Sequence, residues 1–139
     1  MSLPKPVAVA LYSILAGAGC GGSIAAFCAW LAWQQYPFMS FMGDGANIVF
    51  VGWGIGGIVG FVVCWRLSGL ITETWRRAAM GVTAGVGGGP GAGGGGQTLG
   101  MASMMSMSPL TAYYLPAYVV VFIVAGVVFY RLARKAAAA

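Results

Sequence analysis

Few residues in this sequence are suited to acid–base or metal chemistry. Histidine is absent, and the only acids are Asp44 and Glu73. Imidazole ligation of haem or zinc, a Ser-His-Asp triad and a pair of catalytic carboxylates are therefore excluded. The chain also lacks the mid-membrane carboxylate on which many proton-driven machines depend. We expect a protein without enzyme activity, metal or small-molecule substrate.

Sulfur is the remaining source of reactivity. Cys20 and Cys28 stand about 12 Å apart along one expected helix at 1.5 Å per residue, too far for a disulfide between them. A bond from Cys64 to one of these two is the alternative to three buried free thiols, which we favour.

Two low-complexity stretches also resemble binding motifs. Four methionines near the C-terminal third would be soft Cu(I) ligands, but no Cys or His stands beside them, so we expect them to fill gaps in a packed interior. They are Met101, Met104, Met105 and Met107. The run "GGGPGAGGGG" lacks the Lys and the Ser or Thr of a phosphate-binding P-loop. Neither stretch predicts a ligand.

The amino-acid composition indicates whether the surface of the chain faces water or lipid. The 139 residues are 60% hydrophobic and only 6% charged, whereas soluble domains carry about a quarter charged residues. The net charge of +5 comes from single cations at the ends of apolar runs, an arrangement that favours lipid headgroups over nucleic acid. These cations are Lys5, Arg66, Arg76, Arg77, Arg131, Arg134 and Lys135. We expect an integral membrane protein.

The apolar runs predict an all-α fold with four membrane-spanning helices in one domain, residues 1–139. The expected spans cover about 7–33, 48–70, 75–94 and 109–131. The first run continues past Cys20, so we expect a retained helix rather than a cleaved signal. The third is rich in glycine and should break near Pro90 to Gly96; three helices joined by a flexible loop are the alternative.

Charge placement favours four crossings. Cations follow or precede the apolar runs in three groups, around Lys5, from Arg66 to Arg77, and from Arg131 to Lys135. With four crossings all three groups share one face of the membrane and Asp44 lies on the other, as the positive-inside tendency favours. With three crossings the C-terminal group is separated from the rest.

Glycines recur every fourth position in three of the expected spans. Residues four apart lie on one helix face, and small residues there allow helix backbones to approach closely in lipid. The sequence therefore predicts glycine-mediated helix packing. The residues expected at these contacts are Gly17, Gly21, Gly52, Gly56, Gly60, Gly81 and Gly85, with Gly89 and Gly93 continuing the third row.

Two adjoining motifs resemble a known family. They are "W-G-x-G-G-x-x-G-x-x-x-C-W-R" from Trp53 to Arg66 and "E-T-W-R-R-A-A-M-G-V-T-A-G" from Glu73 to Gly85. Both are similar to the channel family of the mitochondrial inner-membrane import translocases (TIM). The resemblance implies four glycine-rich spanning helices, and its translocase members use disulfides, which bears on Cys64.

The family contains import channels and an accessory subunit of respiratory complex I. Channels carry acids that face a lateral cavity, but this chain has Val63 where such an acid would precede Cys64, and its first helix has none. The resemblance therefore implies a non-catalytic accessory subunit of a complex I-like assembly in the mitochondrial inner membrane. An import channel, or a small structural subunit of a prokaryotic respiratory or photosynthetic complex, is the alternative.

Expected partners are the other subunits of a large membrane complex and lipids, with no nucleic acid and no small-molecule substrate. The residues expected to contact lipid or a partner are Arg66, Trp75, Arg76 and Arg77. No cofactor is expected, although a phospholipid such as cardiolipin is a candidate ligand for Arg66. The family places both termini in the intermembrane space, whereas the charge rule favours the matrix, so the orientation stays open.

Overall fold

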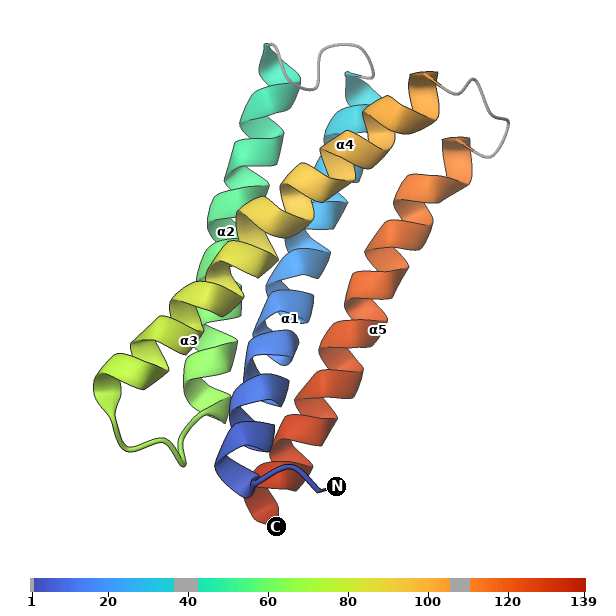
Figure 1. Cartoon of the computed structure of the whole chain (residues 1–139). Helices are drawn as coiled ribbons and strands as arrows, with labels where there is room; N and C mark the ends of the chain where they lie inside the picture. The colour runs from blue at the N-terminus through green and yellow to red at the C-terminus, as the bar shows by residue number, and fades with distance from the viewer. Residues whose placement is uncertain (1, 37–42, 106–110) are drawn as a thin grey trace.

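The chain folds into a bundle of helices. A computed structural model describes residues 2–36, 43–105 and 111–139, and within these ranges it contains helices and no strand. The elements are α1 (Lys5–Gln35), α2 (Asp44–Leu67), α3 (Thr74–Val86), the π-helical turn η1 (Gly87–Gly91), α4 (Ala92–Met105) and α5 (Thr111–Ala138). Figure 1 shows α3, η1 and α4 as one bent rod that crosses α2 and α1 diagonally.

Three helices are long and apolar enough to cross a membrane. They are Lys5–Gln35, Asp44–Leu67 and Tyr113–Ala138. Large apolar side chains remain exposed along α2 and α5, as expected for helices in contact with lipid. Examples are Phe50, Val51, Ile55, Ile58, Val120, Val121, Val124 and Val127. The chain is therefore a membrane protein, as its composition predicts.

Helix α1 lies at the centre and contacts every other element. Its buried positions are almost all small, and the largest fully buried side chains of the described residues are valine, cysteine and serine. A core made mostly of small side chains forms where helix backbones lie close together. The centre of the bundle is therefore lined mainly by small residues.

The third helical segment continues where the sequence predicts a break. Pro90 has no N–H and its ring clashes with the carbonyl four residues earlier, which normally ends or kinks a helix. Here the backbone widens into the π turn η1 and resumes as α4, so the rod is continuous from Thr74 to Met105. The expected break near Pro90 to Gly96 is wrong, and the segment expected over 75–94 continues to Met105.

The other expected ranges overlap the observed helices and differ at their ends. The first helix is longer than 7–33, and the second begins four residues earlier than 48–70 and ends at Leu67. Gly43, directly before α2, has φ of 107°, a conformation open to glycine and strained for other residues. The fourth, expected over 109–131, runs from Thr111 to Ala138. Residues 37–42, between the first two expected spans, and residues 106–110, which include the first two positions of the expected fourth span, lie outside the described residues.

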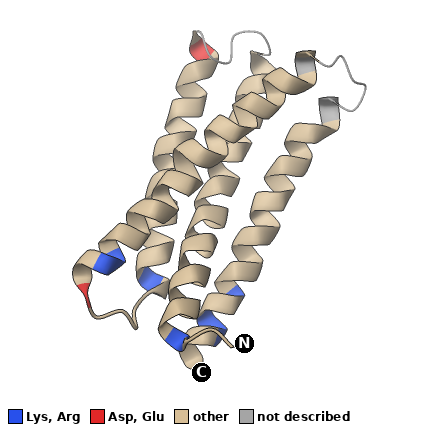
Figure 2. Cartoon of the chain, in the orientation of Figure 1, with Lys and Arg blue, Asp and Glu red and all other residues tan. Residues whose placement is uncertain are grey.

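Charge is segregated along the bundle. Lysine and arginine lie at the end that also holds both termini, on the start of α1, the end of α2, the start of α3 and the end of α5 (Figure 2). Asp44 begins α2 at the opposite end, and Glu73 precedes α3 at the cationic end. The three cationic groups thus share one end of the molecule.

Candidate functional site: the glycine contacts and the cationic end

Glycines bring α1 and α2 into backbone contact. A Cβ added to Gly56 would lie 2.5 Å from the carbonyl oxygen of Gly21, and one on Gly60 would lie 3.0 Å from that of Gly17. Gly52 faces the side chain of Cys28 in the same row. All five glycines are buried. The structure therefore brings together the two glycine rows predicted for the first two spans.

A second face of α2 meets the bent rod. A Cβ on Gly85 would lie 2.8 Å from the carbonyl oxygen of Gly57, and one on Gly81 would meet the ring of Phe61 at 2.7 Å. Gly81 and Gly85 thus face α2, and their role in holding the helices together stays a prediction. Their partner Gly57 was not among the predicted residues, although its place beside Gly56 in the same run was a visible signal.

Two further close approaches were missed. Gly88 in η1 lies between α1 and α2, where an added Cβ would be 3.2 Å from the carbonyl oxygen of Gly17. Gly126 in α5 faces Gly19, whose added Cβ would lie 2.5 Å from the Gly126 nitrogen. Gly88 is hidden in an unbroken glycine run. Gly126 is conspicuous as the lone glycine of an apolar, valine-rich helix.

Aromatic side chains cover the glycines of α4. Trp53 packs over Gly93, Tyr118 over Gly95 and Trp33 over Gly100. The Tyr118 hydroxyl donates a 3.0 Å hydrogen bond to the carbonyl oxygen of Ala92, directly after the π turn. These three aromatic residues join α4 to α1, α2 and α5.

The expectation that the methionines fill gaps in a packed interior is wrong for Met101 and Met105, because both are exposed. The side chain of Met104 and the whole of Met107 lie outside the described part of the structure.

The arginines expected to contact lipid or a partner divide into different environments. Arg77 packs inside the chain, with its guanidinium carbon 4.3 Å from the Trp65 ring and Nη2 donating to the Trp65 carbonyl oxygen. The Trp65 ring in turn stacks on the Phe61 ring, with the ring centres 5.9 Å apart. Arg77 is thus held between α2 and α3 by a cation–π contact and a hydrogen bond, and its expected contact with lipid or a partner stays a prediction.

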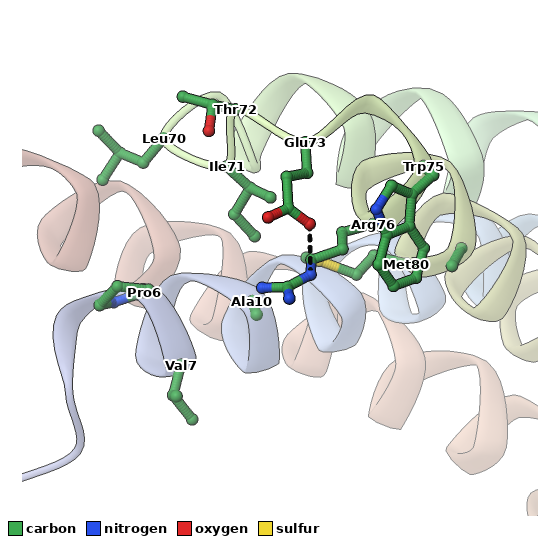
Figure 3. A pocket seen from close by; sticks show the side chains of 11 residues that line it. Pro6, Val7, Ala10, Leu70, Ile71, Thr72, Glu73, Trp75, Arg76 and Met80 are labelled. Carbon is green, nitrogen blue, oxygen red and sulfur yellow. Dashed lines mark ion pairs between the residues drawn. The ribbon is translucent and has the colours of Figure 1, made fainter.

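Trp75 and Arg76 line a groove between the start of α1 and the α2–α3 connection, shown in Figure 3. Arg76 Nε forms a 2.7 Å ion pair with Glu73 Oε2. The guanidinium carbon of Arg76 lies 5.4 Å from the centre of the Trp75 ring. The Trp75 side chain is 68% exposed at this end of the bundle. Pro6, Val7 and Ala10 form the opposite wall. This groove combines an apolar lining with a charge pair that is already neutral.

Arg66 lies in a different groove, between the ends of α2 and α5. The groove encloses about 700 Å³ and is lined by Val62, Val63, Arg66, Leu67, Tyr130, Arg134, Ala137 and Ala138. Arg134 and Tyr130 were not predicted as site residues. Their spacing of four places them on one face of α5, but nothing in the sequence alone pairs that face with Arg66.

The three cysteines are free thiols, and Cys64 is buried. The alternative disulfide from Cys64 is therefore not formed. The favoured expectation of three buried free thiols agrees with the structure for Cys64, whereas Cys20 and Cys28 are free but only half-buried. Across the described ranges, no three of the chain's Cys, Asp and Glu residues gather where they could hold a metal ion.

No protein-family model, curated protein or solved structure matches this chain. The resemblance to the import-translocase channel family therefore stays a prediction based on the two quoted motifs.

Proposed function

We propose that this chain is a non-catalytic structural subunit of a larger membrane assembly, with a complex I-like respiratory complex of the mitochondrial inner membrane as the first candidate. The observation that carries the proposal is the backbone contact of α1, α2 and η1. At Gly17, Gly21 and Gly56 there is no room for a side chain between these elements. Such a centre suits a rigid packing element better than a channel or a binding cavity.

In this proposal, glycine packing is the means by which the bundle holds together. Lipid gives little hydrophobic drive for helix association, so close backbone approach and van der Waals contact replace it. The support is that the glycines meet backbone on neighbouring helices, including Gly19 against Gly126 and Gly85 against Gly57.

We further propose that residues 74–105 cross the membrane as the third of four spans. The rod is about 48 Å long at 1.5 Å per residue, enough to cross a hydrocarbon core of about 30 Å at a tilt. Two exposed threonines within the rod have hydrogen-bonded hydroxyls, since Thr83 and Thr98 donate 2.9 Å hydrogen bonds to the carbonyl oxygens of Ala79 and Gly94. Self-satisfied hydroxyls suit a lipid-facing surface.

The import channel is the weaker candidate because of where the acids lie. Asp44 is the first residue of α2 and Glu73 directly precedes α3. Both positions are helix ends, outside the middle of any proposed span. A cavity that attracts basic presequences needs negative charge along its wall, and this chain supplies none there.

The test is the state of the chain in its own membrane. An affinity-tagged full chain should co-migrate with a large respiratory assembly after mild detergent extraction and native electrophoresis, and mass spectrometry should identify that assembly's subunits. Migration only as a free monomer would contradict the subunit role. Specific crosslinking of a basic presequence peptide to α1 and α2 would instead support the import channel.

A further inference from the structure

The groove between the ends of α2 and α5 carries positive charge that the chain does not neutralise. Arg66 and Arg134 both line it and both are exposed. In the described part of the chain, neither has an ion pair, a hydrogen bond or an aromatic contact, whereas Arg76 is paired with Glu73 and Arg77 stacks on Trp65. The groove in Figure 3 is internally neutral, and the α2–α5 groove is not.

Apolar or aromatic side chains precede both arginines in this groove, and Ala137 and Ala138 line it beyond Arg134. On α2, Val62 lies one turn before Arg66, and on α5, Tyr130 lies one turn before Arg134. An acyl chain would contact Val62, and a phosphate would contact the two arginines one turn further along the helices. The volume of about 700 Å³ falls within the range of about 300–1,000 Å³ that is usual for ligand pockets.

Both arginines also lie close to the C-terminal ends of long apolar helices. Arg66 is about 33 Å from Asp44 along α2, and Arg134 about 35 Å from Thr111 along α5, at 1.5 Å per residue. These distances exceed the hydrocarbon thickness of about 30 Å. With Asp44 and Thr111 at the opposite interface and little helix tilt, these lengths would carry both guanidinium groups to the headgroups of the cationic end.

We propose that this groove is a binding site for an anionic phospholipid. Its phosphate would accept hydrogen bonds from Arg66 and Arg134, the Tyr130 ring would lie at the interface, and an acyl chain would run over Val62. Basic pockets between membrane helices bind such headgroups, and the planar guanidinium matches phosphate geometry. The proposal requires only the membrane location of the chain, so it is independent of the subunit role.

The test measures lipid binding to the purified full chain in an uncharged detergent. Phosphatidylglycerol and phosphatidylcholine with the same acyl chains are compared by native mass spectrometry and by the thermal unfolding midpoint. We expect phosphatidylglycerol alone to bind and to raise the midpoint of the unaltered chain. In the variant R66Q/R134Q, the affinity for phosphatidylglycerol should fall by about tenfold or more, because two charge-assisted contacts are lost.

The matched control is R131Q/K135Q, which removes two exposed cations of α5 outside the groove-lining set. It should keep the tight binding, whereas R66K/R134K, which keeps the charge but loses the planar guanidinium, should bind with an affinity between those of the unaltered chain and R66Q/R134Q. Circular dichroism of each variant verifies that the helices are intact.

Four results would overturn the proposal. Equal weakening by both glutamine pairs would indicate diffuse surface charge, and equal binding of phosphatidylcholine would remove headgroup selectivity. A shift produced by glycerol phosphate alone would indicate a soluble anion instead of a lipid. Loss of co-purifying subunits from R66Q/R134Q without any lipid effect would assign the groove to an acidic protein partner.

Discussion

At the scale of single residues, a glycine matters in this bundle where a neighbouring backbone occupies the place of its side chain. Gly56 and Gly54 lie two residues apart in α2. An added Cβ at Gly56 meets the Gly21 and Gly88 carbonyl oxygens, whereas one at Gly54 meets nothing within 4 Å. Gly56→Leu should therefore destabilise the fold by about 3 kcal/mol through overpacking, as measured by chemical unfolding in micelles.

Gly54→Leu is the matched control for this prediction. It adds the same side chain to the same helix on a face open to lipid, so unfolding should change by no more than about 0.5 kcal/mol. If both variants lose stability equally, the cause is general disruption of α2 and not the contact with α1.

The sequence predicted the glycine rows of α1 and α2 because a period of four is a local property of each helix. It did not predict Gly126 or the internal stacking of Arg77, because each depends on a partner brought from a distant segment. Gly126 meets Gly19 and Arg77 meets Trp65. A lone glycine or an arginine in a basic group carries no signal of which helix will face it.

At the scale of elements, the bent rod shows where local rules were overridden by packing. Proline normally predicts the end of a helix, and the expected break at Pro90 followed from that rule. The structure keeps the rod helical because the π turn accommodates the proline ring, while Gly88 and Gly89 hold that turn against α1 and α2. The tertiary contacts that favour continuation are invisible to a local pattern.

The hydrogen bond from Tyr118 links α5 to the rod at the point where regular helical bonding is perturbed. Tyr118→Phe removes the donor to the Ala92 carbonyl oxygen and keeps the ring. We expect a loss of about 1 kcal/mol in unfolding free energy, typical of one hydrogen bond between membrane helices. Unfolding by titration with a denaturant in micelles measures this change in free energy.

Tyr113→Phe provides the comparison, since Tyr113 lies on the same helix and its side chain is 68% exposed. Its stability should equal that of the unaltered chain. An unchanged Tyr118→Phe, or an equal loss in both variants, would mean that the bond to Ala92 does not secure the rod.

At the scale of the whole molecule, the predicted sharing of one end by all cationic groups agrees with the structure (Figure 2). It could be predicted because the order of apolar runs and cations is written directly in the chain. The assembly that surrounds the bundle could not be predicted in this way. Exposed apolar residues on α2 and α5 would suit contact with lipid and contact with a neighbouring protein helix equally well. Partner identity therefore depends on experiment.

The most direct measurement is the sidedness of both termini in sealed vesicles. Single cysteines replace Ser2, Asn47 or Ala138 in a chain whose native cysteines are alanine, and a membrane-impermeant maleimide is added from each side. With four crossings, positions 2 and 138 react from one side and position 47 from the other. Labelling of positions 2 and 138 from opposite sides would show an odd number of crossings and contradict the four-span bundle.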